Sequence, residues 1–173
     1  MSDYYGSLDL PPLQLDLDLA DLERRFHLKS RQWHPDRFAR ASAAEQQAAL
    51  DASSLLNDAY RTLRDPLRRA EYALKVAGLN IGEQGNKDVP ADLLEEVFDF
   101  NMALEEADAD EIGVARERFA DMRNEIDEQM LMLFARHDAA PARATLEELR
   151  ALLNRRRYIA NLIATASGEG IRH

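Results

Sequence analysis

One stretch of the sequence decides the fold: Arg31-Gln32-Trp33-His34-Pro35-Asp36-Arg37-Phe38. The residue before a proline is pushed out of helical geometry, so a helix that reaches Trp33 must end before Pro35. The proline ring also fixes one backbone dihedral and stiffens the turn. His34 supplies a ring with a donor and an acceptor nitrogen, and Asp36 supplies a carboxylate that can cap the backbone or meet a partner's arginine. A stiff turn that carries two such groups suits recognition of another molecule.

A helix is expected on the N-terminal side of this turn. Asp16 or Asp18 can cap a helix that runs to about Trp33. Its apolar positions follow a spacing of three and four residues and form one buried stripe. The stripe consists of Leu19, Leu22, Phe26, the stem of Lys29, and Trp33. A short aromatic segment that starts at Tyr4-Tyr5 comes earlier, and Pro11-Pro12 limits any helix there to a turn or two.

The helical period returns on the C-terminal side of the turn. A helix is expected from about Ala43 to Leu63, and its clearest inward positions are Leu56, Tyr60 and Leu63. Asp65-Pro66 then predicts a new helix, because an N-cap residue is followed by proline in the first helical position. Gly78 is the expected end of that helix.

The second half of the chain predicts a separate helical module. Residues 78–89 contain three glycines and no helical period, which indicates a boundary. Beyond it, helices are expected from about Pro90 to Ala107, from about Glu111 to Arg136 and from about Ala142 to Ala166. Their short connections favour antiparallel neighbours.

Apolar positions along one side of the two later helices would form a common core. They are Ile112, Phe119, Met122, Ile126, Met130 and Leu133, then Leu146, Leu149, Leu153, Ile159 and Ile163. The predicted fold is therefore all-α, with a helical hairpin domain at 1–78, a linker at 79–89, a three-helix bundle at 90–166 and a flexible tail at 167–173.

The outward face of the helix before the turn is basic. It carries Arg24, Arg25, Lys29 and Arg31, and Arg37 and Arg40 extend it past the turn. Basic side chains beside a rigid loop would steer an acidic partner surface into register. The alternative interpretation is a solvated helix surface next to an ordinary helix-ending turn.

Composition excludes several classes of function. Residues 1–78 carry 11 Lys and Arg against 12 Asp and Glu, whereas residues 79–173 carry 11 against 20. An acidic second half would repel phosphate and argues against nucleic-acid binding there. The chain has no cysteine, which excludes disulfides and cysteine nucleophiles and fits a cytoplasmic protein. No apolar run is long enough to cross a membrane, and the start of the chain lacks a signal-peptide pattern.

Catalysis and metal binding have little support in the sequence. A His34/Asp36 dyad could in principle transfer protons, but no nucleophile or glycine loop accompanies it. The four histidines show no metal-ligand spacing. We therefore expect no enzyme activity, no metal site and no cofactor.

Residues 1–78 resemble a J-domain throughout. The aromatic start, Pro11-Pro12, the basic helix, the stretch around His34-Pro35-Asp36, and Leu56-Asn57-Asp58-Ala59-Tyr60-Arg61-Thr62-Leu63 come in the expected order. The segment Leu63-Arg64-Asp65-Pro66-Leu67-Arg68-Arg69-Ala70-Glu71-Tyr72 looks like the HscB family rather than general DnaJ proteins. The glycine/phenylalanine-rich stretch and cysteine zinc module of general DnaJ proteins are also missing.

This resemblance implies a co-chaperone of iron–sulfur cluster assembly. The J-domain is expected to bind the DnaK-type chaperone HscA and stimulate its ATPase through His34, Pro35, Asp36 and the basic side chains Arg24, Arg25, Lys29, Arg31 and Arg37. The C-terminal bundle is expected to bind the scaffold protein IscU and deliver it. A general J-domain co-chaperone with a different client range is the alternative.

The resemblance also implies where the scaffold would bind. The matching positions on the first and last helices of the bundle are Leu94, Glu95, Phe98, Asp99, Met102, Arg157 and Tyr158. Two of them depart from the family pattern, since Glu95 stands where an apolar residue is common and Met102 where an acidic one is. The first helix also holds more apolar residues than one inward stripe can bury, and an exposed apolar patch ringed by acidic residues indicates a protein partner. The alternatives are that these residues all pack internally and that Arg155-Arg156-Arg157 is a solvated charge run.

Overall fold

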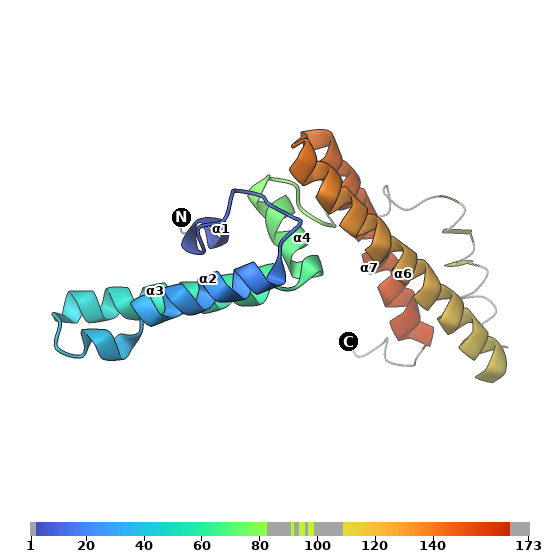
Figure 1. Ribbon diagram of the computed structural model, residues 1–173. Coiled ribbons are helices and arrows are strands. Elements are labelled where there is room, and N and C mark those ends of the chain that lie inside the picture. Colours follow the sequence, from blue (N-terminus) through green and yellow to red (C-terminus); the bar gives the residue numbers. More distant parts are fainter. Residues whose placement is uncertain (1–2, 83–90, 92–93, 96, 99–108, 167–173) are drawn as a thin grey trace. The chain divides into compact units, whose positions relative to one another are not determined.

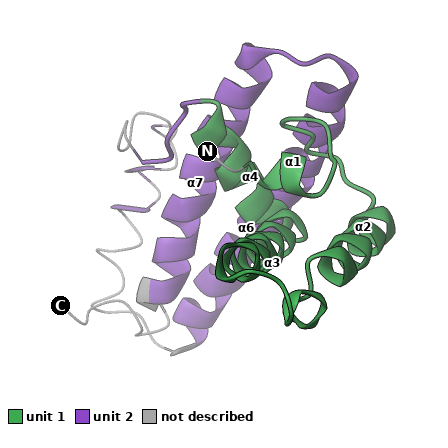
Figure 2. Ribbon diagram, turned by 90° about the vertical axis from the view of Figure 1, so that its left-hand side faces the viewer, with its two compact units in different colours: residues 1–77 green, residues 78–173 purple. Residues whose placement is uncertain are grey.

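The computed structural model describes residues 3–82, 91, 94–95, 97–98 and 109–166, and within these it contains helices and no strand. The all-α prediction is confirmed. The chain divides into two compact units, Met1–Ala77 and Gly78–His173 (Figure 2). Most of the expected linker at 79–89 lies outside the described residues, and the predicted domain limits stay predictions.

Unit 1 is built around an antiparallel hairpin of two long helices, α2 and α3, which lie side by side with a short turn at their tip (Figure 1). The short turn is a 3-10 helix, η1, which begins at Pro35 and has His34 as its N-cap. The elements in chain order are α1 (Tyr4–Ser7), α2 (Leu19–Gln32), η1 (Pro35–Phe38), α3 (Ala43–Leu63) and α4 (Pro66–Val76).

Local capping chemistry determines where these helices begin. The Asp18 carboxylate accepts hydrogen bonds from the backbone N–H groups of residues 20 and 21, which identifies it as the cap of α2. Ser42 and Glu45 form a reciprocal capping box at the start of α3. Asp65 caps α4, and Pro66 occupies its first turn. Caps of this kind contribute about 1 kcal/mol each to helix stability.

The core of unit 1 lies where α1, α2 and α3 meet. Its buried members are Tyr5, Leu8, Leu10, Leu17, Leu22, Leu56, Ala59 and Leu63. Phe26 and Tyr60 stack against this core with ring centroids 4.3 Å apart. The prediction that Leu19 faces inward is wrong, because its side chain is 52% exposed. Leu15 and Leu17, from the extended segment ahead of α2, are buried instead.

A second contact joins α1 and α4, the first and the last helix of unit 1 in the sequence. The Tyr72 ring stacks on Tyr4 with centroids 4.4 Å apart. The Tyr72 hydroxyl accepts from the Tyr4 N–H at 3.0 Å and donates to the Asp3 carboxylate at 2.9 Å. The hydroxyl thus has both a donor and an acceptor partner, far apart from it in the sequence.

Unit 2 contains two long antiparallel helices that lie side by side, α6 (Ala109–Ala139) and α7 (Arg143–Ala166) (Figure 1). Their buried apolar residues are Phe119, Ile126, Met130 and Phe134 on α6 and Leu146, Leu149, Leu152, Leu153, Ile159 and Leu162 on α7. The expected inward position Leu133 is only half-buried, and the adjacent Phe134 is buried. A 31-residue helix changes phase relative to a pattern of threes and fours, so the buried stripe continues one residue later.

The expected helix from Pro90 to Ala107 falls largely outside the described residues. Residues 91, 94, 95, 97 and 98 are helical, and Val97 is 3% exposed. Val97 therefore belongs to the core, although it lies in a segment rich in charged residues.

Ion pairs join the two helices of unit 2. Both Arg156 nitrogens Nε and Nη2 donate to the Asp127 carboxylate, at 2.5 and 3.0 Å. Arg136 pairs with Glu148 nearer the helix connection. The arginine run at 155–157 is thus not uniformly solvated, because its middle member ties α7 to α6.

We predict that Tyr72→Phe lowers the free energy of unfolding of unit 1 by about 1 kcal/mol, because the Tyr4 N–H and Asp3 lose a partly buried partner while the ring stack remains. Urea denaturation followed by far-ultraviolet circular dichroism measures this change. Tyr60→Phe is the matched control: that ring is also stacked, and the described residues offer its hydroxyl no hydrogen bond. Equal effects of the two substitutions would show that the hydrogen bonds of the Tyr72 hydroxyl do not stabilise unit 1.

The same phenol predicts a change in stability at alkaline pH. Burial raises the pKa of Tyr72; the hydrogen bond from Tyr4 opposes this shift, and the Asp3 carboxylate adds to it. Folding favours the protonated phenol, so its contribution is complete below the unfolded pKa of about 10 and is lost as pH rises through the folded value. Unfolding titrations between pH 9 and 11 should show a smaller loss of stability for Tyr72→Phe than for the wild type.

Candidate partner-binding surfaces

The His-Pro-Asp tip is a capped 3-10 turn. α2 ends with Trp33 as its C-cap, and His34 adopts an extended conformation with φ −64° and ψ 129°, as expected for a residue before proline. The His34 side chain then caps η1, because its Nδ1 accepts a hydrogen bond from the Asp36 N–H at 3.3 Å. Pro35 occupies the first turn of η1, where the missing N–H costs nothing.

The ring of His34 is anchored through Nδ1, which also lies 3.5 Å from the Asp36 carboxylate. The His34 side chain is nevertheless 58% exposed. The rest of the ring is therefore available to a partner.

Two aromatic rings brace the tip. Trp33, at the end of α2, and Phe38, at the end of η1, are nearly parallel, with centroids 6.0 Å apart and an interplanar angle of 6°. Trp33 precedes the tripeptide in the sequence and Phe38 follows it, and their stacking brings the two ends of the turn together. The stack restricts the movement of the tip relative to the hairpin, which supports presentation of His34 and Asp36 in one geometry.

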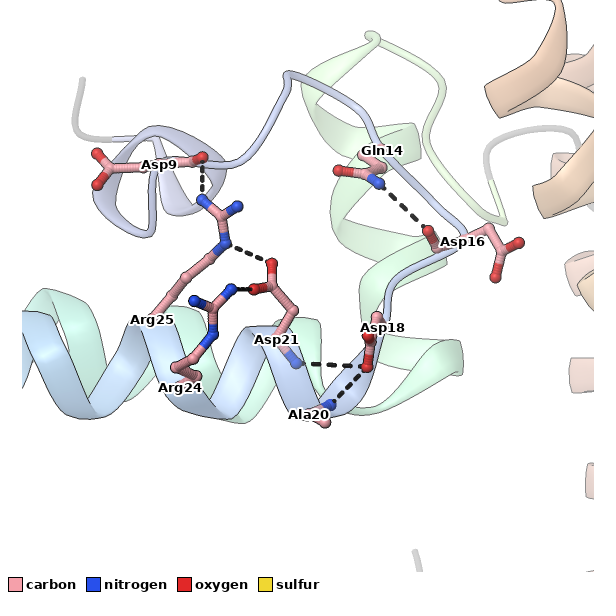
Figure 3. A network of polar contacts seen from close by, with 8 residues as sticks. All are labelled: Asp9, Gln14, Asp16, Asp18, Ala20, Asp21, Arg24 and Arg25. Carbon is pink, nitrogen blue, oxygen red and sulfur yellow. Dashed lines mark hydrogen bonds and ion pairs between the residues drawn. The ribbon is translucent and has the colours of Figure 1, made fainter.

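The basic face divides into two parts, and its first part is engaged within the protein. Arg24 and Arg25 both bond to the Asp21 carboxylate, as Figure 3 shows, and the Arg25 Nε contact is 2.6 Å. These hydrogen bonds, that of Arg25 first, hold the pKa of Asp21 below its usual range. Sequence spacing could have identified this cluster, because side chains three and four residues apart are neighbours on a helix.

Arg25 and Lys29 also hold the segment that follows α1. Arg25 Nη1 donates to the Asp9 carbonyl at 2.7 Å (Figure 3), and Lys29 Nζ lies 2.7 Å from the Asp9 carboxylate. Asp9 has a φ of 54°, a conformation that aspartate adopts more readily than most residues. The predicted binding residues Arg25 and Lys29 therefore have a structural role, which no sequence signal revealed because their partner is 16 or more residues away.

The second part of the basic face lies at the tip and is exposed. Arg37 Nη1 reaches the Arg31 carbonyl at 3.4 Å, which places these two residues beside the tripeptide. Arg40 is also exposed. Among the residues that the structure describes, no carboxylate pairs with any of the three. Their charges are open to an acidic partner.

The expected scaffold-binding residues lie in unit 2. Leu94 is half-buried and Glu95 is exposed, while Phe98 is 66% exposed beside the buried Val97. In this short segment Val97 is therefore part of the core, whereas Phe98 is exposed to solvent. Asp99 and Met102 lie outside the described residues, so their expected roles stay predictions.

The α7 part of that surface is described in full. Arg157 is exposed and Tyr158 is half-buried, next to the ion-paired Arg156. The turn at Gly82 lies against the same helix, with its N–H donating to Asn154 Oδ1 at 2.9 Å. Sequence reasoning missed the Gly82–Asn154 contact.

The described residues show no group of three or more histidine, aspartate or glutamate side chains arranged to hold a metal ion. Across the same part of the chain, no helix combines the length and the apolar character that crossing a membrane requires.

Comparisons with known proteins bear on both units. The chain matches the family model of the DnaJ domain over residues 3–73 and that of the HSCB C-terminal oligomerisation domain over residues 89–167. A protein named co-chaperone protein HscB homolog from Neisseria meningitidis is 35% identical over 134 residues, which span 78% of each chain. One of the same name from Paraburkholderia phymatum is 30% identical over 163 residues, or 94% of this chain and 93% of that one.

Two solved structures share the architecture. The crystal structure of human co-chaperone protein HscB aligns with a TM-score of 0.70 and 27% identity, covering 99% of this chain and 83% of that one. Chaperone HscB from Vibrio cholerae aligns with a TM-score of 0.69 and 25% identity, covering 98% and 100%. The matches span both units, and the His-Pro-Asp turn lies within the matched DnaJ region. The chain therefore belongs to the HscB family of J-domain co-chaperones.

Proposed function

We propose that this protein stimulates the ATPase of a DnaK-type chaperone, of the HscA class, and delivers the scaffold protein IscU to it for iron–sulfur cluster assembly in the cytoplasm. The observation that carries the proposal is the tip. His34 caps η1 through its Nδ1, and the Trp33–Phe38 stack braces the turn. Arg31 and Arg37 lie beside it, and no carboxylate among the described residues pairs with either.

The electrostatics of the tip support an acidic partner surface. Arg31 and Arg37 can meet carboxylates with charge-assisted hydrogen bonds, which are stronger than neutral ones. The exposed Arg24 can leave Asp21 at little cost, because surface ion pairs contribute about 1 kcal/mol or less. Arg25 and Lys29 would contribute mainly by holding the α2 face in shape. The partner would therefore be recognised chiefly at the tip.

The exposed residues of unit 2 support a second, scaffold-binding surface. Phe98 presents a large apolar ring next to the charged Glu95, and Arg157 and Tyr158 present a cation and an amphipathic ring. Apolar contacts surrounded by polar groups are usual for protein–protein interfaces. Because both surfaces are on one chain, binding of the scaffold would raise its effective concentration at the chaperone.

The decisive experiment is steady-state ATP hydrolysis by the HscA-type chaperone with this protein added, with and without IscU. We expect stimulation that increases further when IscU is present. Stimulation that is indifferent to IscU would indicate a J-domain co-chaperone with another client. Absence of stimulation for both HscA and DnaK would contradict the proposal.

His34→Gln should abolish the ATPase stimulation and leave IscU binding unchanged, because the tip and the scaffold surface lie in different units. Calorimetric titration with IscU measures the second quantity. His27→Gln is the matched control, since this exposed histidine lies on α2 away from the tip and should preserve both activities. Loss of both activities in His34→Gln would rule out separate roles for the two units.

The two parts of the basic face should respond differently to substitution. Arg31→Ala should reduce stimulation several-fold and change the free energy of unfolding by less than about 0.5 kcal/mol. Asp9→Asn should instead lower stability by about 1 kcal/mol, because it removes the Lys29 ion pair, and leave most of the stimulation intact. Urea denaturation and the ATPase assay together test this, and the reverse pattern would contradict the assignment.

A further inference from the structure

The turn at Gly82 is attached to α7 next to the expected scaffold-binding residues. Its N–H donates to the side-chain oxygen of Asn154, which is itself only 6% exposed. A backbone donor that bonds to a buried amide has a fixed position, since breaking the contact would leave the buried oxygen without that partner. The turn therefore has a definite place on the surface of α7.

Arg157 lies over this turn. Asn154 and Arg157 are three residues apart on α7 and so are neighbours on its surface. A Cβ atom built on Gly82 would lie 2.9 Å from Arg157 Nη1, closer than such atoms approach one another. The guanidinium thus occupies the space that the missing side chain leaves open. Gly82 also has a φ of 88°, which residues with a side chain rarely adopt.

The charge of Arg157 is available for binding. Its neighbour Arg156 is bound on both nitrogens to Asp127, whereas no carboxylate among the described residues pairs with Arg157. The Arg157 side chain is exposed, yet one side of its guanidinium rests on the Gly82 turn. This arrangement restricts a long side chain while leaving its donors open to an anionic group.

We propose that Gly82 is a positioning residue of the scaffold-binding surface: the turn holds the Arg157 guanidinium where it meets a carboxylate of the scaffold protein. The inference rests on the proposed function, which assigns Arg157 to that surface. Restricting Arg157 before binding lowers the entropy that must be lost when the complex forms. The turn thus increases affinity without contacting the scaffold.

The test is a double-mutant cycle on the affinity of the full-length protein for IscU. Arg157→Ala should weaken binding about tenfold, the range expected for one charge-assisted hydrogen bond. Gly82→Ala should weaken it about threefold, because its Cβ displaces the guanidinium. The double substitution should bind no more weakly than Arg157→Ala alone, since both changes act through one side chain.

Gly78→Ala is the matched control. Gly78 also has a positive φ, of 72°, but nothing lies within 4 Å of a Cβ built on it. It should therefore reproduce the backbone strain without the loss of affinity. Asn154→Ala provides a second route, because it releases the turn without adding an atom, and its effect should also vanish in the Arg157→Ala background. Chaperone ATPase stimulation without IscU should be unchanged in all of these variants.

Three results would decide against the inference. Equal affinities of Gly82→Ala and Gly78→Ala would show that Arg157 is not displaced. Additive losses in the double variants of Arg157 with Gly82 or Asn154 would show that the turn acts elsewhere. Failure of the wild-type protein to bind IscU would overturn both the inference and the proposed function, whereas the first two results would leave that function standing.

Discussion

The contact between α2 and α3 is the interaction on which the candidate chaperone surface depends. Leu22 on α2 and Leu56 and Leu63 on α3 are almost completely buried, and the Phe26–Tyr60 stack covers them. Burying each leucine contributes about 1.5 to 3 kcal/mol, far more than any single surface ion pair. The tip is a turn of four residues with no buried side chain of its own. Its geometry is therefore maintained by the hairpin beneath it, through the end of α2 and the Trp33–Phe38 stack.

The basic residues of α2 show why similar charges have different roles. Arg25 and Lys29 are partly buried and reach the segment after α1, whereas Arg31 and Arg37 are exposed at the tip. The difference arises from Asp9, whose left-handed conformation presents both its carbonyl and its carboxylate to α2. The basic face of α2 is thus stabilised internally by acidic groups. The basic side chains that stay open to a partner are therefore those nearest the tip.

The sequence predicted the ends of α2, α3 and α4 to within about two residues, since the determinants of these ends are local. Pro35, Asp65-Pro66 and Gly78 act through backbone geometry that needs no tertiary structure. The His-Pro-Asp turn was predictable for the same reason, whereas the family was predicted from the resemblance of the motifs in residues 1–78. Errors occurred where tertiary packing decides. Leu19 has the right spacing but is exposed, and Phe134 replaces Leu133 because a long helix shifts phase.

The contacts that position the candidate site residues were beyond prediction for a related reason. Asp9 pairs with Lys29 only because the segment after α1 folds against α2. Gly82 bonds to Asn154, which is 72 positions away in the sequence. Two residues with special backbones lie beside polar side chains: Pro35 keeps the backbone of His34 extended, and Gly82 leaves open the space that the Arg157 guanidinium occupies. A co-chaperone gains affinity for its partners from such restriction, because its binding groups lose less freedom on contact. Loosening either residue would then weaken binding more than folding, so affinity and stability measured side by side distinguish positioning from structure.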